Sequence, residues 1–165
     1  MKILISPFAQ NLRNGKENPK NFPYWSELVS KLIDGGFNVI QIGSSKDTAI
    51  GFDIPSHNHK GTFEFKQNLK LKEIVEHVKN CDVWISVDSF LQHLCAYHEL
   101  KRGIVIFSQS DPKHFGYPRN TNLLKDRKYL REKQFWLWEQ CEYNKEAFVA
   151  AEDVYKAVLK ELQID

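Results

Sequence analysis

The sequence predicts an α/β fold, a Rossmann-like parallel sheet sandwiched by helices. Short apolar runs alternate with longer amphipathic stretches along the chain, which is the pattern of strands joined by crossover helices. Turn-forming residues separate these segments, and small polar residues follow several of the apolar runs, as in strand-to-helix loops. With 165 residues, no internal repeat and no linker-like stretch, the chain is expected to form one domain over residues 1–165.

The first half of the chain predicts three strands and one helix. The first strand is an apolar run that stops at a proline, and the helix has a proline in its first turn. Large apolar residues then recur at helical spacing from Trp25 until Gly35-Gly36 ends the helix. The expected strands cover residues 2–6, 38–42 and 63–65, and the expected helix runs from about Pro23 to residue 34.

The second half predicts two further strands and three helices. Apolar residues form a helical stripe from Leu71, and continuous apolar runs follow Cys81 and Arg102. The expected helices cover residues 71–80, 89–100 and 145–162, the expected strands cover 82–87 and 103–107, and a long loop covers 108–123.

Composition excludes several classes of function. The chain has 23 Lys plus Arg and 21 Asp plus Glu, so its formal net charge of +2 is too small to bind nucleic acid or a membrane by bulk charge. No apolar run is long enough for a membrane span, and the N-terminal run is too short for a signal peptide. The 3 cysteines form no CxxC pair, which argues against a disulfide framework and favours a cytoplasmic protein.

The sequence predicts neither a cofactor nor a metal. The GxGxxG dinucleotide fingerprint and the P-loop are both absent. His57-Asn58-His59 resembles a metal clip, but no cysteine or acidic residue stands at ligand spacing, so a polar loop is the better interpretation. Cys95 falls on the apolar stripe of its helix and is expected to pack in the core rather than to act as a nucleophile.

A strand-to-helix junction is the strongest candidate site. Ligands of open parallel sheets bind outside the carboxyl ends of the strands, and there Asp88-Ser89 leads from an expected strand into an expected helix. The first-turn N–H groups of a helix lack intrahelical partners and sit at its positive end, so they can bind a phosphate. His93 lies one turn further on the face of Ser89 and would lean toward this site. Alternatively, Asp88 caps the helix and His93 is a surface residue.

This segment resembles the nucleotide-sugar-binding half of the family 9 glycosyltransferases, the heptosyltransferases of GT-B fold. The family motif is Asp, Ser or Thr, and Gly, followed by two residues, His and a small apolar pair. Asp88-Ser89, His93 and Leu94-Cys95-Ala96 match this motif, whereas Phe90 stands at the position of the glycine. The likeness covers most of residues 2–120 and includes Asp111-Pro112, which resembles the aspartate-proline loop of the family.

The resemblance implies one half of a GT-B fold that binds a nucleotide diphosphate sugar, an ADP-heptose-like donor, for glycosyl transfer. The residues it assigns to the donor are Asp88, Ser89, Phe90 and His93 at the diphosphate, and Gly43 and Ser44 near the nucleoside. Lys16 would correspond to a family lysine that neutralises phosphate charge, with Arg13 or Lys20 as alternatives. No catalytic residue can be assigned, because the acceptor and the catalytic base of a GT-B enzyme belong to the other domain. A separate acceptor-domain chain or a homodimer would be the expected partner.

Three alternatives stay open at this point. A small nucleotide-processing enzyme of the deoxyribosyltransferase or N-glycosidase type would need a glutamate nucleophile, and Glu99 is the only glutamate near the Ser89 helix. A non-catalytic nucleotide-binding module would need no catalytic residue. Residues 119–133 are rich in Lys and Arg and lie beside aromatic residues, which can bind single-stranded nucleic acid but more often form a solvated helix face.

Overall fold

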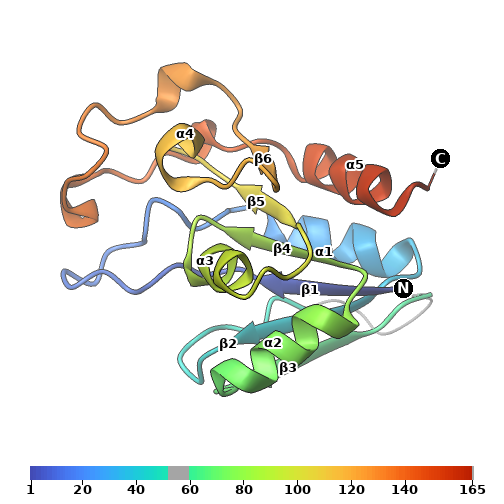
Figure 1. Ribbon diagram of the computed structural model, residues 1–165. Coiled ribbons are helices and arrows are strands. Elements are labelled where there is room, and N and C mark those ends of the chain that lie inside the picture. Colours follow the sequence, from blue (N-terminus) through green and yellow to red (C-terminus); the bar gives the residue numbers. More distant parts are fainter. Residues whose placement is uncertain (52–59, 165) are drawn as a thin grey trace.

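A computed structural model of the chain describes residues 1–51 and 60–164, and it contains a sheet of six parallel strands (Figure 1). The strands follow the order β3-β2-β1-β4-β5-β6 across the sheet. The direction of winding therefore reverses between β1 and β4, and open α/β sheets bind ligands at such a reversal. The strands are β1 Lys2–Ser6, β2 Asn38–Gly43, β3 Phe63–Gln67, β4 Val83–Val87, β5 Ile104–Ile106 and β6 Thr121–Leu123.

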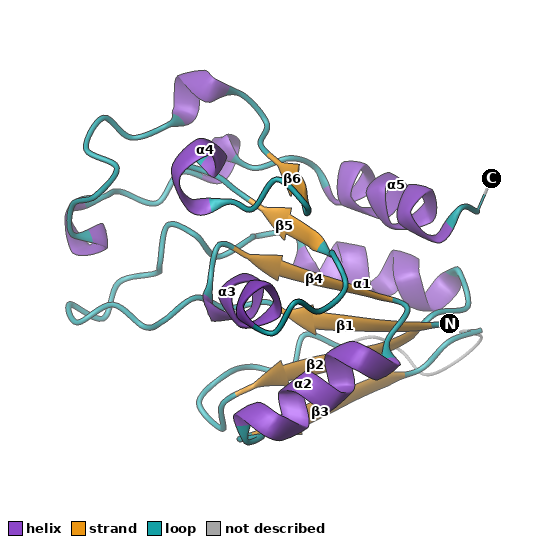
Figure 2. Ribbon diagram, viewed as in Figure 1, coloured by secondary structure: helices purple, strands orange, loops and turns teal. Residues whose placement is uncertain are grey.

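Helices cover both faces of the sheet, as the sequence predicts. Figure 2 shows α2 and α3 in front of the sheet and α1 behind it. Helices α1 and α5 pack into one apolar cluster, and α2 and α3 pack into the other. The helices are α1 Trp25–Asp34, α2 Leu71–Asn80, α3 Phe90–Tyr97, the short α4 Pro112–Phe115, and α5 Ala151–Leu162, with 3-10 turns at Arg127–Tyr129, Trp138–Gln140 and Lys145–Ala147.

Alternation along the central strands divides the core between the two faces. In β1, Ile3 and Ile5 belong to the cluster under α1 and α5, whereas Leu4 belongs to the cluster under α2 and α3. Trp84 of β4 is fully buried on this second face, and a Cβ atom added to Gly103 would lie 2.2 Å from its ring. Gly103 is therefore required so that β5 can begin against the indole.

The structure differs from the sequence prediction in two main places. Residues 121–123 form the edge strand β6 inside the expected long loop, because the backbone of Thr121 and Leu123 continues the ladder with Gly103 and Phe107. The final helix begins at Ala151 rather than near residue 145, because Phe148 and Val149 run in extended form into the core beneath it.

Two smaller observations complete the fold. Helix α3 ends at Tyr97 rather than at residue 100, since Glu99 adopts a left-handed conformation with φ of 54° or less, at 51°. Within the described residues, no helix is both long and apolar enough to cross a membrane. His57-Asn58-His59 lies outside the described residues.

Candidate functional site

A pocket of about 980 Å³ opens beyond the carboxyl ends of β1, β2 and β4. Ser6 follows from β1, Gly43 from β2, and Asp88 directly after β4, and all three line the pocket. Two loops form its outer walls, residues 8–13 and residues 136–139. Figure 1 shows that these loops extend beyond the same edge of the sheet, opposite the two chain termini.

The N-terminus of α3 faces this pocket without a side-chain cap. Ser89 is the N-cap residue, and its backbone is extended, but its hydroxyl makes no hydrogen bond to the first turn. The Ser89 Oγ atom is buried and has no hydrogen-bond partner among the described residues. Ser89 and Phe90 both line the pocket. The first-turn N–H groups and the Ser89 hydroxyl are therefore available to an oxyanion.

Asp88 does not cap the helix as the structural alternative expects. Its side chain is buried, and Oδ1 accepts a hydrogen bond of 2.7 Å from Nε2 of Gln92, one turn along α3. Its Oδ2 lies 2.9 Å from Nζ of Lys20. The negative charge beside the helix N-terminus is thus paired with a cation that also lines the pocket.

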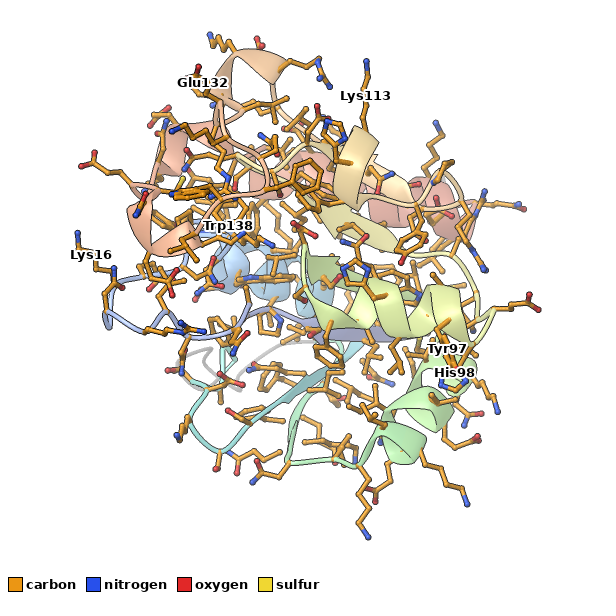
Figure 3. The ribbon with its side chains drawn as sticks, turned by 60° about the vertical axis from the view of Figure 1, so that its left-hand side comes forward. Lys16, Tyr97, His98, Lys113, Glu132 and Trp138 are labelled. Carbon is orange, nitrogen blue, oxygen red and sulfur yellow. The ribbon has the colours of Figure 1, made fainter. Side chains whose placement is uncertain are left out.

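The structure places Lys20, rather than Lys16, at the site. Lys16 is exposed and does not line the pocket, and Figure 3 shows its side chain pointing away from the body of the protein. Lys20 and Arg13, the alternatives to Lys16 on the same loop, both line the pocket. The loop folds back because buried Asn18 accepts a hydrogen bond from the backbone N–H of Lys20 and donates one to the carbonyl of Gln10.

His93 lines the pocket one turn into α3, and its ring is held by a partner on another segment. Its Nδ1 atom lies 3.0 Å from the hydroxyl oxygen of Tyr117, which follows α4. The two rings meet edge to face, with centroids 5.6 Å apart. Nε2 is therefore the ring nitrogen that remains for a ligand.

Gly43 and Ser44 line the opposite end of the pocket, after β2. The Ser44 N–H donates to Oδ2 of Asp47 over 2.5 Å, so Asp47 closes the turn. A Cβ atom on Gly43 would lie 2.6 Å from the same carboxylate oxygen. The small residue at this position lets the Asp47 carboxylate lie directly against the strand end, within the pocket.

An aromatic segment, residues 136–139, forms a wall that the sequence alone does not reveal. The guanidinium of Arg131 stacks over the Trp138 ring at 3.5 Å, and the ammonium of Lys20 lies 4.7 Å from the same ring centroid. Arg131 also donates to the carbonyls of Gln134 and Trp136, and burial lowers its pKa. Figure 3 shows Trp138 on the same side of the molecule as the loop that carries Lys16.

This wall is joined to the loop of residues 8–20. The Arg13 N–H donates to Oε1 of Glu139, and the Asn14 side-chain amide donates to the Glu139 carbonyl. Segments more than a hundred residues apart in the chain thus enclose one pocket. Only their position in the folded chain could identify residues 136–139 as pocket residues.

The remaining candidate residues lie away from the pocket or serve the core. Cys95 is buried in the second apolar cluster, as predicted, and burial raises its pKa to about 12. Glu99 does not line the pocket; it follows Tyr97 and His98, which Figure 3 shows at the end of α3 far from Trp138. This position argues against a nucleophile for nucleoside cleavage. Among the described residues, no group of His, Cys, Asp and Glu side chains could hold a metal ion.

Much of the basic segment at residues 119–133 is engaged within the protein. Arg119 donates to the carbonyl of Leu100, and Arg127 forms a two-point ion pair with Asp111. The segment is mostly loop, with one 3-10 turn at Arg127–Tyr129, rather than a solvated helix. The intramolecular pairs leave little reason to assign this segment to nucleic acid.

Comparison with known proteins agrees with this geometry. The sequence model for glycosyltransferase family 9 (heptosyltransferase) matches residues 1–146. No functionally curated protein matches the sequence.

Solved structures of similar fold are about twice as long as this chain. The heptosyltransferase WaaC of E. coli, solved with ADP, is 15% identical with a TM-score of 0.64, and the match covers 96% of this chain and 43% of WaaC. A family 9 glycosyltransferase from Veillonella parvula is 15% identical with a TM-score of 0.70, over 99% of this chain and 46% of that protein. The dodecameric iron-containing heptosyltransferase TibC, solved with ADP-D-beta-D-heptose, is 16% identical with a TM-score of 0.65, over 98% of this chain and 45% of TibC. TibC comes from enterotoxigenic E. coli.

These matches confirm the predicted α/β, Rossmann-like fold class and its equivalence to one half of a GT-B fold. This chain spans less than half the length of those proteins.

Proposed function

Because this chain belongs to glycosyltransferase family 9, we propose that it binds a nucleoside diphosphate sugar, the donor of a glycosyl transfer, with the diphosphate at the N-terminus of α3. The observation that carries the proposal is the uncapped start of α3, which opens into the pocket while the adjacent Asp88 is paired with Lys20. This arrangement leaves unpaired N–H donors at a positive helix end, which favours an anionic ligand.

Four kinds of donor converge on the proposed diphosphate position. The first-turn backbone N–H groups and the Ser89 hydroxyl come from the helix start, His93 comes from one turn further, and Lys20 comes from the facing loop. Phe90 replaces the glycine of the family motif, but it retains a backbone N–H, and its side chain is 46% exposed at the rim of the pocket. A charge-assisted hydrogen bond of this kind contributes about 1.5–3 kcal/mol.

The nucleoside is proposed to lie toward the carboxyl end of β2, against Gly43, Ser44 and Asp47. The Asp47 carboxylate is an acceptor that a ribose hydroxyl can meet in this position, as acidic residues do in other Rossmann-like sheets. ADP is the first nucleotide to test, since WaaC was solved with ADP and TibC with ADP-D-beta-D-heptose. An ADP-heptose-like sugar is accordingly the donor we propose.

The acceptor and its catalytic base are proposed to come from outside this pocket. A base must lie within hydrogen-bond reach of the acceptor hydroxyl. The pocket carboxylates among the described residues are Asp47, Asp88 and Glu139, and each already faces a donor within the protein. A separate acceptor-binding polypeptide or a second copy of the chain would supply the base. We further propose a reducing compartment such as the cytoplasm, in which the three free thiols are stable.

Isothermal titration calorimetry with ADP, GDP, UDP and CDP tests the donor proposal. The expected result is saturable binding of at least one of them, ADP first, with H93A and S89A each weakening it about ten-fold through loss of one polar contact to a charged group. His98 offers a matched control, because it is an exposed histidine on the same helix segment that does not line the pocket. If none of the four nucleotides binds, or if H98A weakens binding as much as H93A, the proposed site is wrong.

A further inference from the structure

Tyr117 holds the one imidazole that lines the pocket, although nothing in the family motif points to this residue. Its hydroxyl oxygen lies 3.0 Å from Nδ1 of His93, and its ring meets the imidazole edge to face at an interplanar angle of 72°. Both side chains are separated by 24 positions in the sequence. Only the fold brings them together.

The loop that carries Tyr117 is fixed on both sides. The Tyr117 carbonyl accepts hydrogen bonds of 3.0 Å from the Asn122 side-chain amide and from the backbone N–H of Asn120. Just before it, a Cβ atom on Gly116 would lie 2.7 Å from the carbonyl of Pro112, so the chain packs closely against the end of α4. The hydroxyl is therefore presented to His93 from an ordered turn.

The protons of this contact can be arranged in two ways. A neutral imidazole carries one N–H, on Nδ1 or on Nε2. If Nδ1 carries it, Tyr117 accepts, and Nε2 turns a lone pair toward the pocket, where it would repel a phosphate oxygen. If the Tyr117 hydroxyl donates to Nδ1, the proton of His93 is on Nε2, and this N–H is available to the ligand. A phenolic hydroxyl is a good donor, and no other hydrogen-bond partner of it is found among the described residues.

We propose that Tyr117 is a positioning residue that fixes His93 in the Nε2–H form, so that His93 donates a hydrogen bond to the diphosphate. The proposal rests on the proposed function for its ligand, but the tautomer is a property of the free protein. Tyr117 acts through His93 and contacts no reacting atom. The partner of a ring nitrogen commonly sets the proton position on the other nitrogen.

Long-range ¹⁵N–¹H correlation NMR of the free protein at pH 8 tests the tautomer directly. Wild-type His93 is expected to show the Nε2–H pattern, and Y117F is expected to show His93 in exchange between both tautomers. Tyr97 supplies a matched control, since its ring meets His98 at 5.0 Å, and Y97F should leave the His93 signals unchanged. A wild-type His93 that carries its proton on Nδ1, or an unchanged tautomer in Y117F, overturns the proposal.

Calorimetry with ADP then tests the coupling. Y117F is expected to weaken ADP binding about five-fold, the effect of one ordinary hydrogen bond, while Y97F has no effect and the melting temperature of Y117F stays close to that of the wild type. In an H93A background Y117F should cause no further loss. A further loss in that background would show that Tyr117 acts independently of His93 and would refute the positioning role. Failure of the wild type to bind ADP would count against the proposed function alone, because the NMR result decides the tautomer without ligand.

Discussion

Replacement of Lys20 by methionine is the sharpest test of how the site accommodates an acid beside an anion. The substitution removes the ammonium but keeps most of the apolar stem, and it leaves Asp88 with one hydrogen bond, from Gln92. At the observed 2.9 Å, two unit charges attract by about 6 kcal/mol at an effective dielectric constant of 20. Desolvation offsets much of this attraction, because only 3% of the Asp88 side chain and 18% of the Lys20 side chain are exposed.

The expected net loss in K20M is about 2 kcal/mol of unfolding free energy. Removal of one partner from a buried pair usually costs about 3–5 kcal/mol, but here the pocket lets water reach the carboxylate that remains. For a domain of this size, a loss of about 2 kcal/mol lowers the melting temperature by about 4–8 °C. ADP affinity should fall at least about ten-fold, because the bare carboxylate then faces the diphosphate.

Urea denaturation and calorimetry with ADP measure the two effects separately. K16M is the matched control, since Lys16 is an exposed lysine on the same loop outside the pocket, and it should change neither quantity. D88N in the K20M background removes the unpaired charge and should restore part of the stability. If K20M unfolds like the wild type, or if K16M rather than K20M abolishes ADP binding, the assignment of Lys20 is refuted.

Two further predictions concern the scaffold. G103A should lose about 1–3 kcal/mol of unfolding free energy in urea denaturation, because the added methyl group would lie 2.2 Å from the Trp84 ring; stability equal to that of the wild type would mean that β5 can shift. The hydrogen bond from Arg127 holds the pKa of Asp111 below its usual value, so this carboxyl contributes stability that is present above the unfolded-state pKa of about 4 and is lost as the pH falls below it. D111N should therefore show a shallower decline in melting temperature between about pH 5 and pH 2 than the wild type, and an identical decline would refute this role of the pair.

Local sequence patterns were sufficient for most of the fold. Apolar periodicity locates β1, β2 and β4 within about one residue, because their alternate side chains enter two apolar clusters and must be apolar throughout. The three-residue strand β6 carries only one large apolar side chain, and its pairing with β5 depends on a neighbour distant in the chain. No local pattern can reveal such a strand.

The candidate site was predictable in part, for a related reason. The Asp88-Ser89 junction and His93 lie on one strand-to-helix unit, so the sequence alone places them together. The choice of Lys20 over Lys16 depends on the buried Asn18, whose side chain turns the loop, and Tyr117 and Trp138 arrive from other segments. These contacts are products of the tertiary structure.

The pairing of Lys20 with Asp88 also explains how a carboxylate can occupy the entrance of an anion site. The N-terminus of a helix carries roughly half a positive charge, which is less than the full negative charge of Asp88. An unpaired Asp88 would therefore make the start of α3 repel a diphosphate. Lys20 cancels that charge at 2.9 Å, so the helix terminus remains positive. An ammonium has three N–H donors, and one of them directed to Asp88 leaves two for phosphate oxygens. Lys20 can thus bind the ligand without leaving the buried acid unpaired.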